Sequence, residues 1–274
     1  MKVSYGSVNP EKAIEWMEYA RMMNVTRVFT LTHDLDPPIK RVFEYYSKIG
    51  FLEMIPVNPA IKKGGKPRHF RPPRDSQQAW VDATMAAQDC KHRLAGFDYL
   101  FILDVDEFIV PQDAKQRSYL KILQASSKTH PEASGLIFDS HVVMLNWNTT
   151  RKSPLYITTH VNRTLVTNYD GNATNTRWAF RPKMVYFVQN NRIWPNRGTK
   201  IAYVDHSLYH LLHYRKCKMA LWKGCLWAER TEEKNMLLVE TPMIKRLRQL
   251  PLEEILPENM GYVEGLRNWK IPGA

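Results

Sequence analysis

The chain of 274 residues is long enough for one large domain or two small ones with a substantial hydrophobic core. Its composition, 44% hydrophobic and 24% charged, is ordinary for a globular protein and excludes a disordered chain. No stretch approaches the roughly 18 uninterrupted apolar residues that span a bilayer. The start shows no charged-then-apolar signal segment, so we expect any targeting segment to lie outside this chain.

The formal net charge of +12 raises the question of nucleic-acid binding. Much of the excess lies in Lys62–Arg74, where glycine and proline prevent a regular basic helix. No zinc-finger spacing or aromatic RNA-binding signature accompanies this segment, which disfavours nucleic acid as a partner. A solvated basic loop explains the segment, and a phosphate-bearing small molecule would explain part of the excess charge.

The first predicted helix begins at Pro10, because Asn9 can cap it and proline suits the first helical position. The β-branched segment Val25–Leu31 predicts a strand. An amphipathic helix follows, with Gly50 placed to end it, and Phe51–Val57 predicts the next strand.

After the basic loop, Asp75 and Ser76 can cap a third helix, which Gly96 closes, and Tyr99–Leu103 predicts a buried strand. Strand and helix therefore alternate as far as residue 103, the pattern of a parallel sheet with helices on both faces.

The second half has strand-like segments without long helices between them, and helical character returns after Ala220. These segments are Gly135–Leu145, Lys183–Gln189 and Lys200–His206. The sequence shows no repeats and no convincing interdomain linker. We therefore predict a single α/β domain over residues 1–274, with a mostly parallel mixed sheet and helices on both faces.

Three carboxylates, Asp104, Asp106 and Glu107, follow the Tyr99–Leu103 strand. Ligands of an open α/β sheet bind beyond the carboxyl ends of the strands. Asp-X-Asp in an extended segment puts both carboxylates on one side, and two such hard oxygen ligands suit Mn²⁺ or Mg²⁺ with phosphate oxygens completing the shell. Glu107 would point the other way, and we expect it to hold a backbone group or an arginine.

The same acids could instead form a strand-end turn that caps a following helix. Apolar residues on both sides, "LFIL" before the acids and "FIV" after them, favour the metal interpretation, because a surface turn has no need of buried flanks.

The segment Gln88–Pro111 resembles the central block of glycosyltransferase family 92, in which an Asp-Cys pair on a helix precedes a strand ending in Asp-X-Asp-Glu-Phe. The resemblance extends to Asn9–Phe29, to Arg181–Val185 and to the His-Tyr-Arg block His210–Cys217. It covers most of the chain in the expected order. It implies a GT-A fold, a sugar-nucleotide donor, inversion at the anomeric carbon and a membrane-anchored enzyme of the secretory pathway, with the anchor outside this chain.

The resemblance also implies roles for single residues. His213 would be a third metal ligand beside Asp104 and Asp106, since neutral imidazole is an acceptable ligand of Mn²⁺ and less so of Mg²⁺. The alternative for His213 is a buried histidine that donates to a backbone carbonyl.

The sugar nucleotide would contact Asp89 on the third helix and Asp104, with Lys183 and Arg215 as cationic partners of the diphosphate. Either cation could instead be an ordinary ion-pair residue. The resemblance points to a uridine-diphosphate sugar, with galactose expected, and to residues 1–111 as the nucleotide-sugar half and 112–274 as the acceptor half.

An inverting transfer needs a carboxylate that deprotonates the acceptor hydroxyl. The sequence offers Asp139, Asp170, Asp205 and Glu229. We expect Asp139 to be the base, because it ends an apolar strand as Asp104 does.

Three cysteines do not make a disulfide framework, although Cys217 and Cys225 are close enough in sequence to pair. A cysteine common near the family's first strand is replaced here by Ser4, which leaves Cys90 without an obvious partner.

Four Asn-X-Ser/Thr sequons, at Asn24, Asn148, Asn162 and Asn172, indicate a secretory lumen, and together with the resemblance they predict the Golgi. Asn24, at a helix-to-strand corner, could be structural only.

Two other functions fit part of the pattern. Phosphatases of the haloacid-dehalogenase type also place Asp-X-Asp after a hydrophobic strand, but on the first strand of their core and usually without a Glu in the position of Glu107. A carbohydrate-binding domain without turnover is the second alternative, and a donor-hydrolysis assay would separate it from an enzyme.

Overall fold

The computed structural model describes residues 4–5, 8–56, 74–113, 115–148, 151–165, 176–189, 192–217 and 225–271. The helices are α1 (Pro10–Met22), α2 (Pro37–Lys48), α3 (Arg74–Arg93), α4 (Tyr119–Thr129), α5 (Tyr156–Thr159), α6 (Glu240–Leu247), α7 (Leu252–Ile255) and α8 (Met260–Asn268), with 3₁₀ turns η1 (Pro182–Met184), η2 (Cys225–Trp227) and η3 (Asn235–Val239). The strands are β1 (Ser4–Tyr5), β2 (Val28–His33), β3 (Leu52–Pro56), β4 (Leu100–Phe101), β5 (Glu107–Pro111), β6 (Ala133–Met144), β7 (Asn162–Thr164), β8 (Thr176–Phe180), β9 (Val185–Gln189), β10 (Arg192–Pro195), β11 (Lys200–Tyr203), β12 (Tyr209–Arg215) and β13 (Arg230–Glu232).

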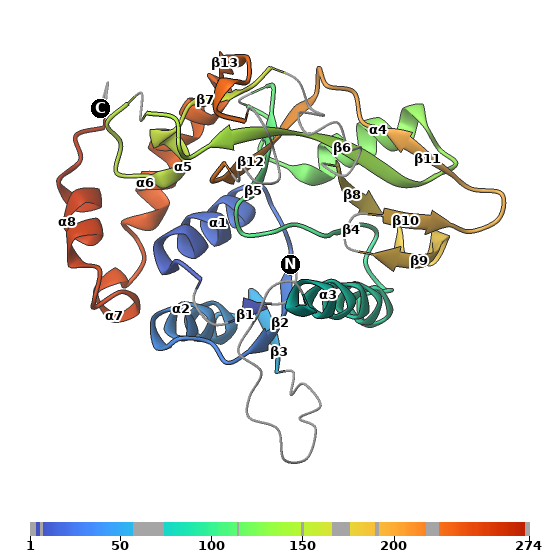
Figure 1. Cartoon of the computed structure of the whole chain (residues 1–274), viewed down its shortest axis with the longest axis horizontal. Coiled ribbons are helices and arrows are strands. Elements are labelled where there is room, and N and C mark those ends of the chain that lie inside the picture. Colours follow the sequence, from blue (N-terminus) through green and yellow to red (C-terminus); the bar gives the residue numbers. More distant parts are fainter. Residues whose placement is uncertain are drawn as a thin grey trace.

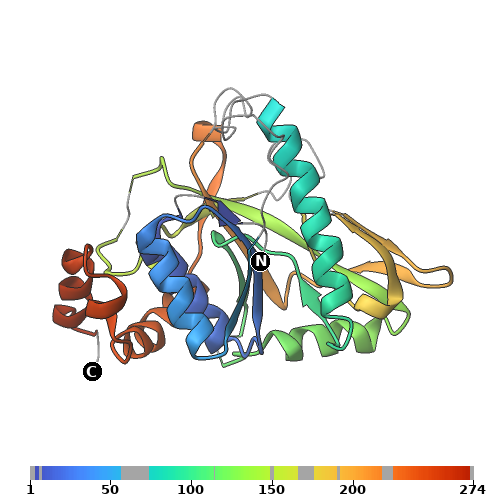
Figure 2. The same cartoon turned by 90° about the horizontal axis from the view of Figure 1, so that it is seen from below.

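Two sheets organise the molecule (Figure 1). Strands β1, β2 and β3 form a small parallel sheet, flanked by α2 on one side and α3 on the other. The larger mixed sheet has the order β4-β8-β6-β12-β5, and β11 pairs with β6 at its side. Figure 2 shows the same arrangement from below, with α1 and α2 together on one side of the parallel sheet. The expected α/β class with a mixed sheet is confirmed.

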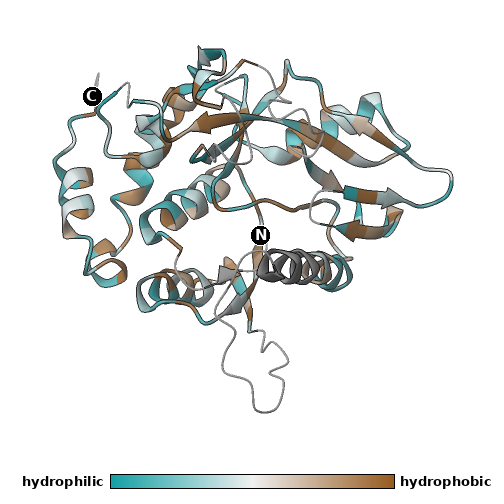
Figure 3. Ribbon diagram, in the orientation of Figure 1, coloured by the Kyte–Doolittle hydropathy of each residue, from teal (hydrophilic) through white to brown (hydrophobic). Residues whose placement is uncertain are grey.

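The long strand β6 is the centre of the mixed sheet and is buried almost throughout. It appears as a largely hydrophobic ribbon in Figure 3. This sheet takes strands from both expected halves of the chain. Strands β4 and β5 belong to residues 1–111, and β6, β8 and β12 belong to residues 112–274.

The position of β4 differs from the sequence-based expectation. It does not join the parallel sheet but pairs antiparallel with β8, with Leu100 opposite Phe180. A cavity of about 240 Å³ lies between β2 and β4, lined largely by apolar side chains that include Phe29 and Ile102. Local hydrophobicity identified β4 as a strand, but its partner is set by packing against residues far along the chain.

Helix boundaries follow the predicted chemistry. The Asn9 side chain accepts a hydrogen bond from the Lys12 backbone nitrogen at 2.8 Å and caps α1, with Pro10 as the first helical residue. Gly50, just after α2, adopts φ +74°, a left-handed conformation that costs glycine no Cβ clash. The expected caps of α3, Asp75 and Ser76, lie within a part of that helix whose side chains are outside the described residues.

The cysteines behave as the spacing indicates. Cys217 and Cys225 form a disulfide with their Cα atoms 5.9 Å apart. Cys90 is partly buried on α3 and packs against a hydrophobic cluster. Across the described residues, the helices are all too short or too polar to span a bilayer.

Helix α1 is fixed to the rest of the domain by buried polar contacts. Trp16 Nε1 donates to the Glu107 carbonyl at 3.0 Å, and the Tyr19 hydroxyl donates to the Ile109 carbonyl at 2.8 Å. The fully buried Glu15 carboxylate accepts from the backbone nitrogens of Tyr156 and Ile157 at 2.9 and 3.1 Å. Helix α1 thereby holds both β5 and the start of α5.

The buried Glu15 predicts a pH dependence of stability. Burial raises its pKa to about 7, although the hydrogen bonds from Tyr156, Ile157 and Tyr262 act in the opposite direction. Because the folded pKa exceeds the unfolded value, the stabilisation from protonation is present below about pH 4.5 and is lost as the pH rises through 7.

We therefore expect the free energy of unfolding of wild type to fall relative to that of Glu15→Gln between pH 4.5 and 7, by on the order of 3 kcal/mol. Urea unfolding of both proteins across this pH range measures the difference between their free energies of unfolding. Titrating groups other than Glu15 contribute equally to both proteins and cancel in that difference. A difference that stays constant with pH contradicts the assignment.

Candidate functional site

The acidic turn lies between β4 and β5, at an edge where β12 also ends. Strand β5 opens at Glu107 and pairs antiparallel with β12, which puts His213 directly opposite Glu107. The Tyr214 backbone nitrogen donates to the Asp106 carbonyl at 2.8 Å and ties the turn to β12. The chain thus brings His213 to the acids although more than a hundred residues separate them in sequence.

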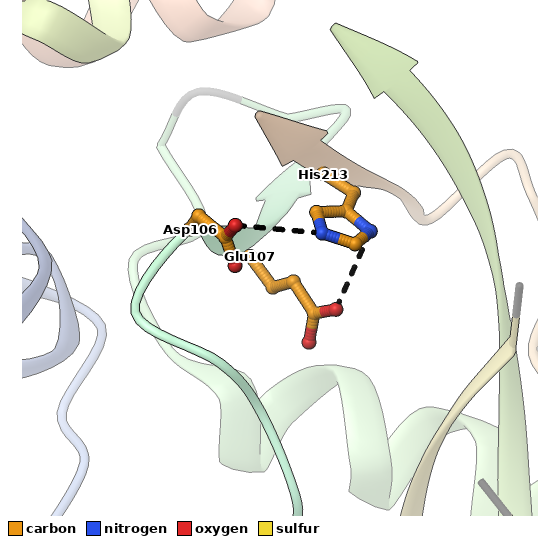
Figure 4. Close-up of side chains that lie close together, drawn as sticks. All are labelled: Asp106, Glu107 and His213. Atoms are coloured by element: carbon orange, nitrogen blue, oxygen red, sulfur yellow. Dashed lines mark ion pairs between the residues drawn. The ribbon is translucent and has the colours of Figure 1, made fainter. Parts of the chain in front are cut away.

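The His213 ring lies between two carboxylates (Figure 4). Its Nε2 is 3.5 Å from Asp106 Oδ2, and its Nδ1 is 3.5 Å from Glu107 Oε1. The His213 side chain is 10% exposed and that of Asp106 is 35% exposed. One face of this group is therefore open to a ligand, while the histidine is held from behind.

Glu107 is fully buried and makes an ion pair with Arg177 on β8. Arg177 Nε donates to Glu107 Oε2 at 2.6 Å, and a second guanidinium nitrogen pairs with Oε1. The Asp104 backbone nitrogen also donates to Oε2, at 2.9 Å. The expectation that Glu107 holds a backbone group or an arginine is confirmed, and the carboxylate in fact contacts both.

The ion pair keeps Arg177 charged inside the protein. Burial lowers the pKa of Arg177, but the charge and hydrogen bond of Glu107 outweigh burial and leave this pKa above its ordinary value. The guanidinium also lies 3.8 Å from Asp104 Oδ2, so it carries positive charge to the acidic turn.

Asp106 and His213 fit a divalent metal. One ligand atom each from Asp106, Glu107 and His213 lies within 4.8 Å of the others. Neighbouring ligands of an octahedral ion stand about 3 Å apart, close to the observed separation of Asp106 and His213. Glu107 is already bound to Arg177, and its place beside His213 Nδ1 suits a carboxylate that orients a metal-binding histidine. A mixed oxygen and nitrogen pair favours Mn²⁺ over Mg²⁺.

The Asp104 carboxylate is 32% exposed and lies 3.8 Å from the Arg177 guanidinium. Its expected role as a metal ligand beside Asp106 stays a prediction.

The candidate base Asp139 lies on β6, opposite Thr176 on β8. Its Oδ2 is 3.3 Å from His206 Nε2, and its backbone nitrogen donates to the Tyr209 hydroxyl at 2.9 Å. Strand β6 neighbours β12, with Val142 paired to His213, so Asp139 lies on the adjacent strand, three residues before the partner of His213.

The other candidate bases have weaker positions. The Asp205 carboxylate accepts from the Ser207 backbone nitrogen at 2.8 Å in an exposed turn, and Glu229 is exposed. Asp170 lies outside the described residues.

The cationic residues are divided between two ends of the sheet. Arg215 ends β12 and lies two residues beyond His213, on the same face of the strand. Lys183 lies beyond Phe180, whose partner Leu100 begins β4, so the chain carries Lys183 away from the acids.

Asp89 is likewise engaged elsewhere: its carboxylate accepts from Arg93 on α3 at 2.6 Å. The assignment of Asp89 and Lys183 to the donor remains a prediction from resemblance.

His210 serves a separate cluster. Its Nδ1 lies 2.6 Å from Glu233 Oε2, which also accepts from Arg163 at 3.0 Å. Burial is the main cause that lowers the pKa of the adjacent His141 to about 4, and the charge of Arg163 adds to it. His141 is thus a neutral neighbour at ordinary pH, and His210 is committed to Glu233.

Arg177 is a residue of this site that the sequence motifs do not include. The signal was a charged residue inside the otherwise buried strand segment "TRWAF", which requires a buried partner of opposite charge. Glu107 at the start of the buried "EFIVP" gives the same signal with the opposite sign.

Removal of Arg177 tests how much the site depends on this pair. Arg177→Met leaves Glu107 buried without its cation and is expected to reduce the free energy of unfolding by about 3–5 kcal/mol. Arg267→Met is the matched control, because the Arg267–Glu253 pair is exposed and contributes less than about 1 kcal/mol. Urea unfolding compares the two variants, and equal losses would show that the buried pair has no special role.

Comparison with known proteins identifies a family. The profile of Glycosyltransferase family 92 matches residues 4–249. No curated protein matches the chain. The solved structures similar to it include S. aureus TarS 1-349 in complex with UDP (15% identity, TM-score 0.38, 95% of this chain and 71% of that chain) and in complex with UDP-GlcNAc (15%, 0.37, 96% and 72%). These TM-scores are too low to establish a common fold, so the family assignment rests on the sequence match.

Proposed function

The chain belongs to glycosyltransferase family 92, and we propose that it transfers a hexose from a UDP-sugar to a glycan acceptor with inversion. Galactose is the expected hexose. The chain is a glycosyltransferase; the donor, the metal and the stereochemistry are the proposed part. The observation that supports them best is the pairing of Asp106 with His213 across 3.5 Å at the ligand edge of the sheet.

Asp106 and His213 are the residues that would hold the metal, with Glu107 orienting the imidazole. A divalent cation at this position would supply charge neutralisation for the diphosphate as it leaves. Arg215, two residues after His213 on the same face of β12, is placed to bind the same anion. Asp104 is the further metal ligand that the sequence predicts, and its carboxylate also lies 3.8 Å from the Arg177 guanidinium.

Asp139 is the proposed base. In an inverting transfer, the acceptor hydroxyl gives its proton to a carboxylate while its oxygen attacks the anomeric carbon, and the bond to the diphosphate breaks on the opposite face. The Asp139 side chain is 17% exposed, and its carboxylate lies 3.3 Å from Nε2 of the exposed His206.

The proposal is tested first at Asp106. Asp106→Asn keeps the size of the side chain but removes the negative charge that binds the cation, so we expect transfer from UDP-galactose with Mn²⁺ to be abolished. Far-ultraviolet circular dichroism should remain that of wild type. Asp113→Asn, an exposed aspartate beyond β5, is the control and should retain activity. Full activity of Asp106→Asn, or of wild type in excess chelator, would refute the metal site.

The same assay separates two roles for His213. If His213 binds the metal, His213→Ala weakens the apparent affinity for Mn²⁺ by roughly 10- to 100-fold. If His213 is only a packing residue, the melting temperature falls and the Mn²⁺ activation curve is unchanged.

A lumenal Golgi location remains a proposal, supported by the sequons and the family. Asn24 adopts φ +58°, and its side-chain nitrogen donates to the Arg117 carbonyl at 3.2 Å, so its amide is already used in the fold. Asn148 is exposed.

When the chain is secreted from cells behind an added signal, we expect glycans that an endoglycosidase removes, seen as a mobility shift. Asn148→Gln should reduce this shift and Asn24→Gln should leave it unchanged. A protein whose mobility does not respond to the endoglycosidase argues against the lumenal location.

A further inference from the structure

A lysine on α1 lies beside the candidate metal site in a place that is unfavourable for a lysine. Lys12 is in the first turn of α1, three residues after the cap Asn9, where the helix dipole opposes a positive charge. Its side chain is half-buried, and its ammonium makes no hydrogen bond or ion pair with any described residue. Neither helix stability nor a salt bridge therefore accounts for it.

The ammonium is held in position by an aromatic ring. Lys12 Nζ lies 3.8 Å from the centre of the Tyr156 ring, a short cation–π contact. The Tyr156 ring packs on that of Tyr214, with centroids 5.5 Å apart. The backbone of Tyr214 in turn binds the Asp106 carbonyl, so this chain of contacts places Lys12 on the Asp106 side of α1.

The charges around Lys12 agree with this placement. Burial is the largest cause that lowers the pKa of Lys12, and the carboxylate of Asp106 is the largest one that opposes it. Lys216, which follows Arg215 at the end of β12, adds to the lowering. A cation bound to Asp106 would share the carboxylate that now balances Lys12, and an anion such as a diphosphate would compensate the positive charge left there.

We propose that the Lys12 ammonium binds the terminal phosphate of the donor's diphosphate, so that this residue distinguishes a nucleoside diphosphate from a monophosphate. The inference rests on the proposed function, because it takes the donor to be a nucleoside-diphosphate sugar. Lys12 transfers no proton: when the bond between the anomeric carbon and the phosphate oxygen breaks, the electron pair stays on that oxygen and the ammonium stabilises the charge. Tyr156 acts as a positioning residue that holds Lys12.

Calorimetric titration with UDP and with UMP, both in saturating Mn²⁺, tests the assignment. Lys12→Met is expected to weaken UDP binding by about 10-fold and to change UMP binding by less than about 2-fold, since only UDP carries the second phosphate. Lys12→Arg should restore UDP binding to within about 3-fold of wild type, because the guanidinium also stacks on an aromatic ring and binds phosphate. Lys40→Met, at an exposed lysine of α2, is the matched control and should bind UDP as wild type does.

A second pair of variants tests the position of the ammonium. Tyr156→Leu removes the aromatic face and should weaken UDP binding by about 3-fold, in line with the loss of a cation–π contact. Tyr156→Phe keeps the ring and removes a hydroxyl that has no hydrogen-bond partner among the described residues, so it should bind UDP normally.

The outcomes distinguish a failure of the Lys12 assignment from a failure of the proposed function. If wild type binds UDP with Mn²⁺ but Lys12→Met loses nothing, or loses UMP and UDP binding equally, the assignment of Lys12 is overturned and the proposed function stands. If wild type has no affinity for UDP in Mn²⁺, the proposed donor fails and the role of Lys12 fails with it. Because Lys12→Met removes a charge that the helix dipole opposes, its melting temperature should equal or exceed that of wild type.

Discussion

The buried ion pair between Glu107 and Arg177 is the constraint on which the rest of the site depends. Glu107 begins β5 and Arg177 lies on β8, at opposite sides of the mixed sheet's order, so their contact fixes how the sheet closes around the acidic turn. The same carboxylate binds the backbone of Asp104 and stands beside the His213 ring. An ion pair of this kind gives little net stability compared with apolar packing, but it tolerates no loss of one partner. The role of the Glu107–Arg177 pair is to fix the positions of Asp104 and His213.

Two kinds of charge are thus arranged close together. The inner charges, Glu107 and Arg177, are buried and balance one another within the fold. The outer charges, on Asp106, Arg215 and Lys12, are partly exposed and belong to the proposed ligand site. The Glu107–Arg177 pair positions the outer groups but does not neutralise them. The outer groups therefore include both negative and positive charges, which can bind a cation and an anion together. This division is typical of a site organised before its ligand arrives.

The sequence predicted those parts of the structure that are governed by local chemistry. The cap at Asn9, the glycine that ends α2 and the turn of acids after β4 each follow from neighbouring residues. The return of the segment before Arg215 as a buried strand was also predictable, from its apolar run. The antiparallel pairing of β4 with β8 was not, because no local pattern specifies a partner some eighty residues away. Arg177 was missed for the same reason, because the pairing of β8 brings it to the acids.

The disulfide between Cys217 and Cys225 gives the site a dependence on thiol redox state. Cys225 is fully buried with Val142, and Val142 is the neighbour of His213 in the sheet. Cys217 lies two residues after the end of β12, so the bridge joins the end of the strand that carries His213 to the 3₁₀ turn η2, which begins at Cys225. A covalent loop of this size contributes about 2–3 kcal/mol by restricting the unfolded chain. Reduction would leave β12 paired but release its end, so the anchoring of this strand depends on whether the protein matured in an oxidising compartment.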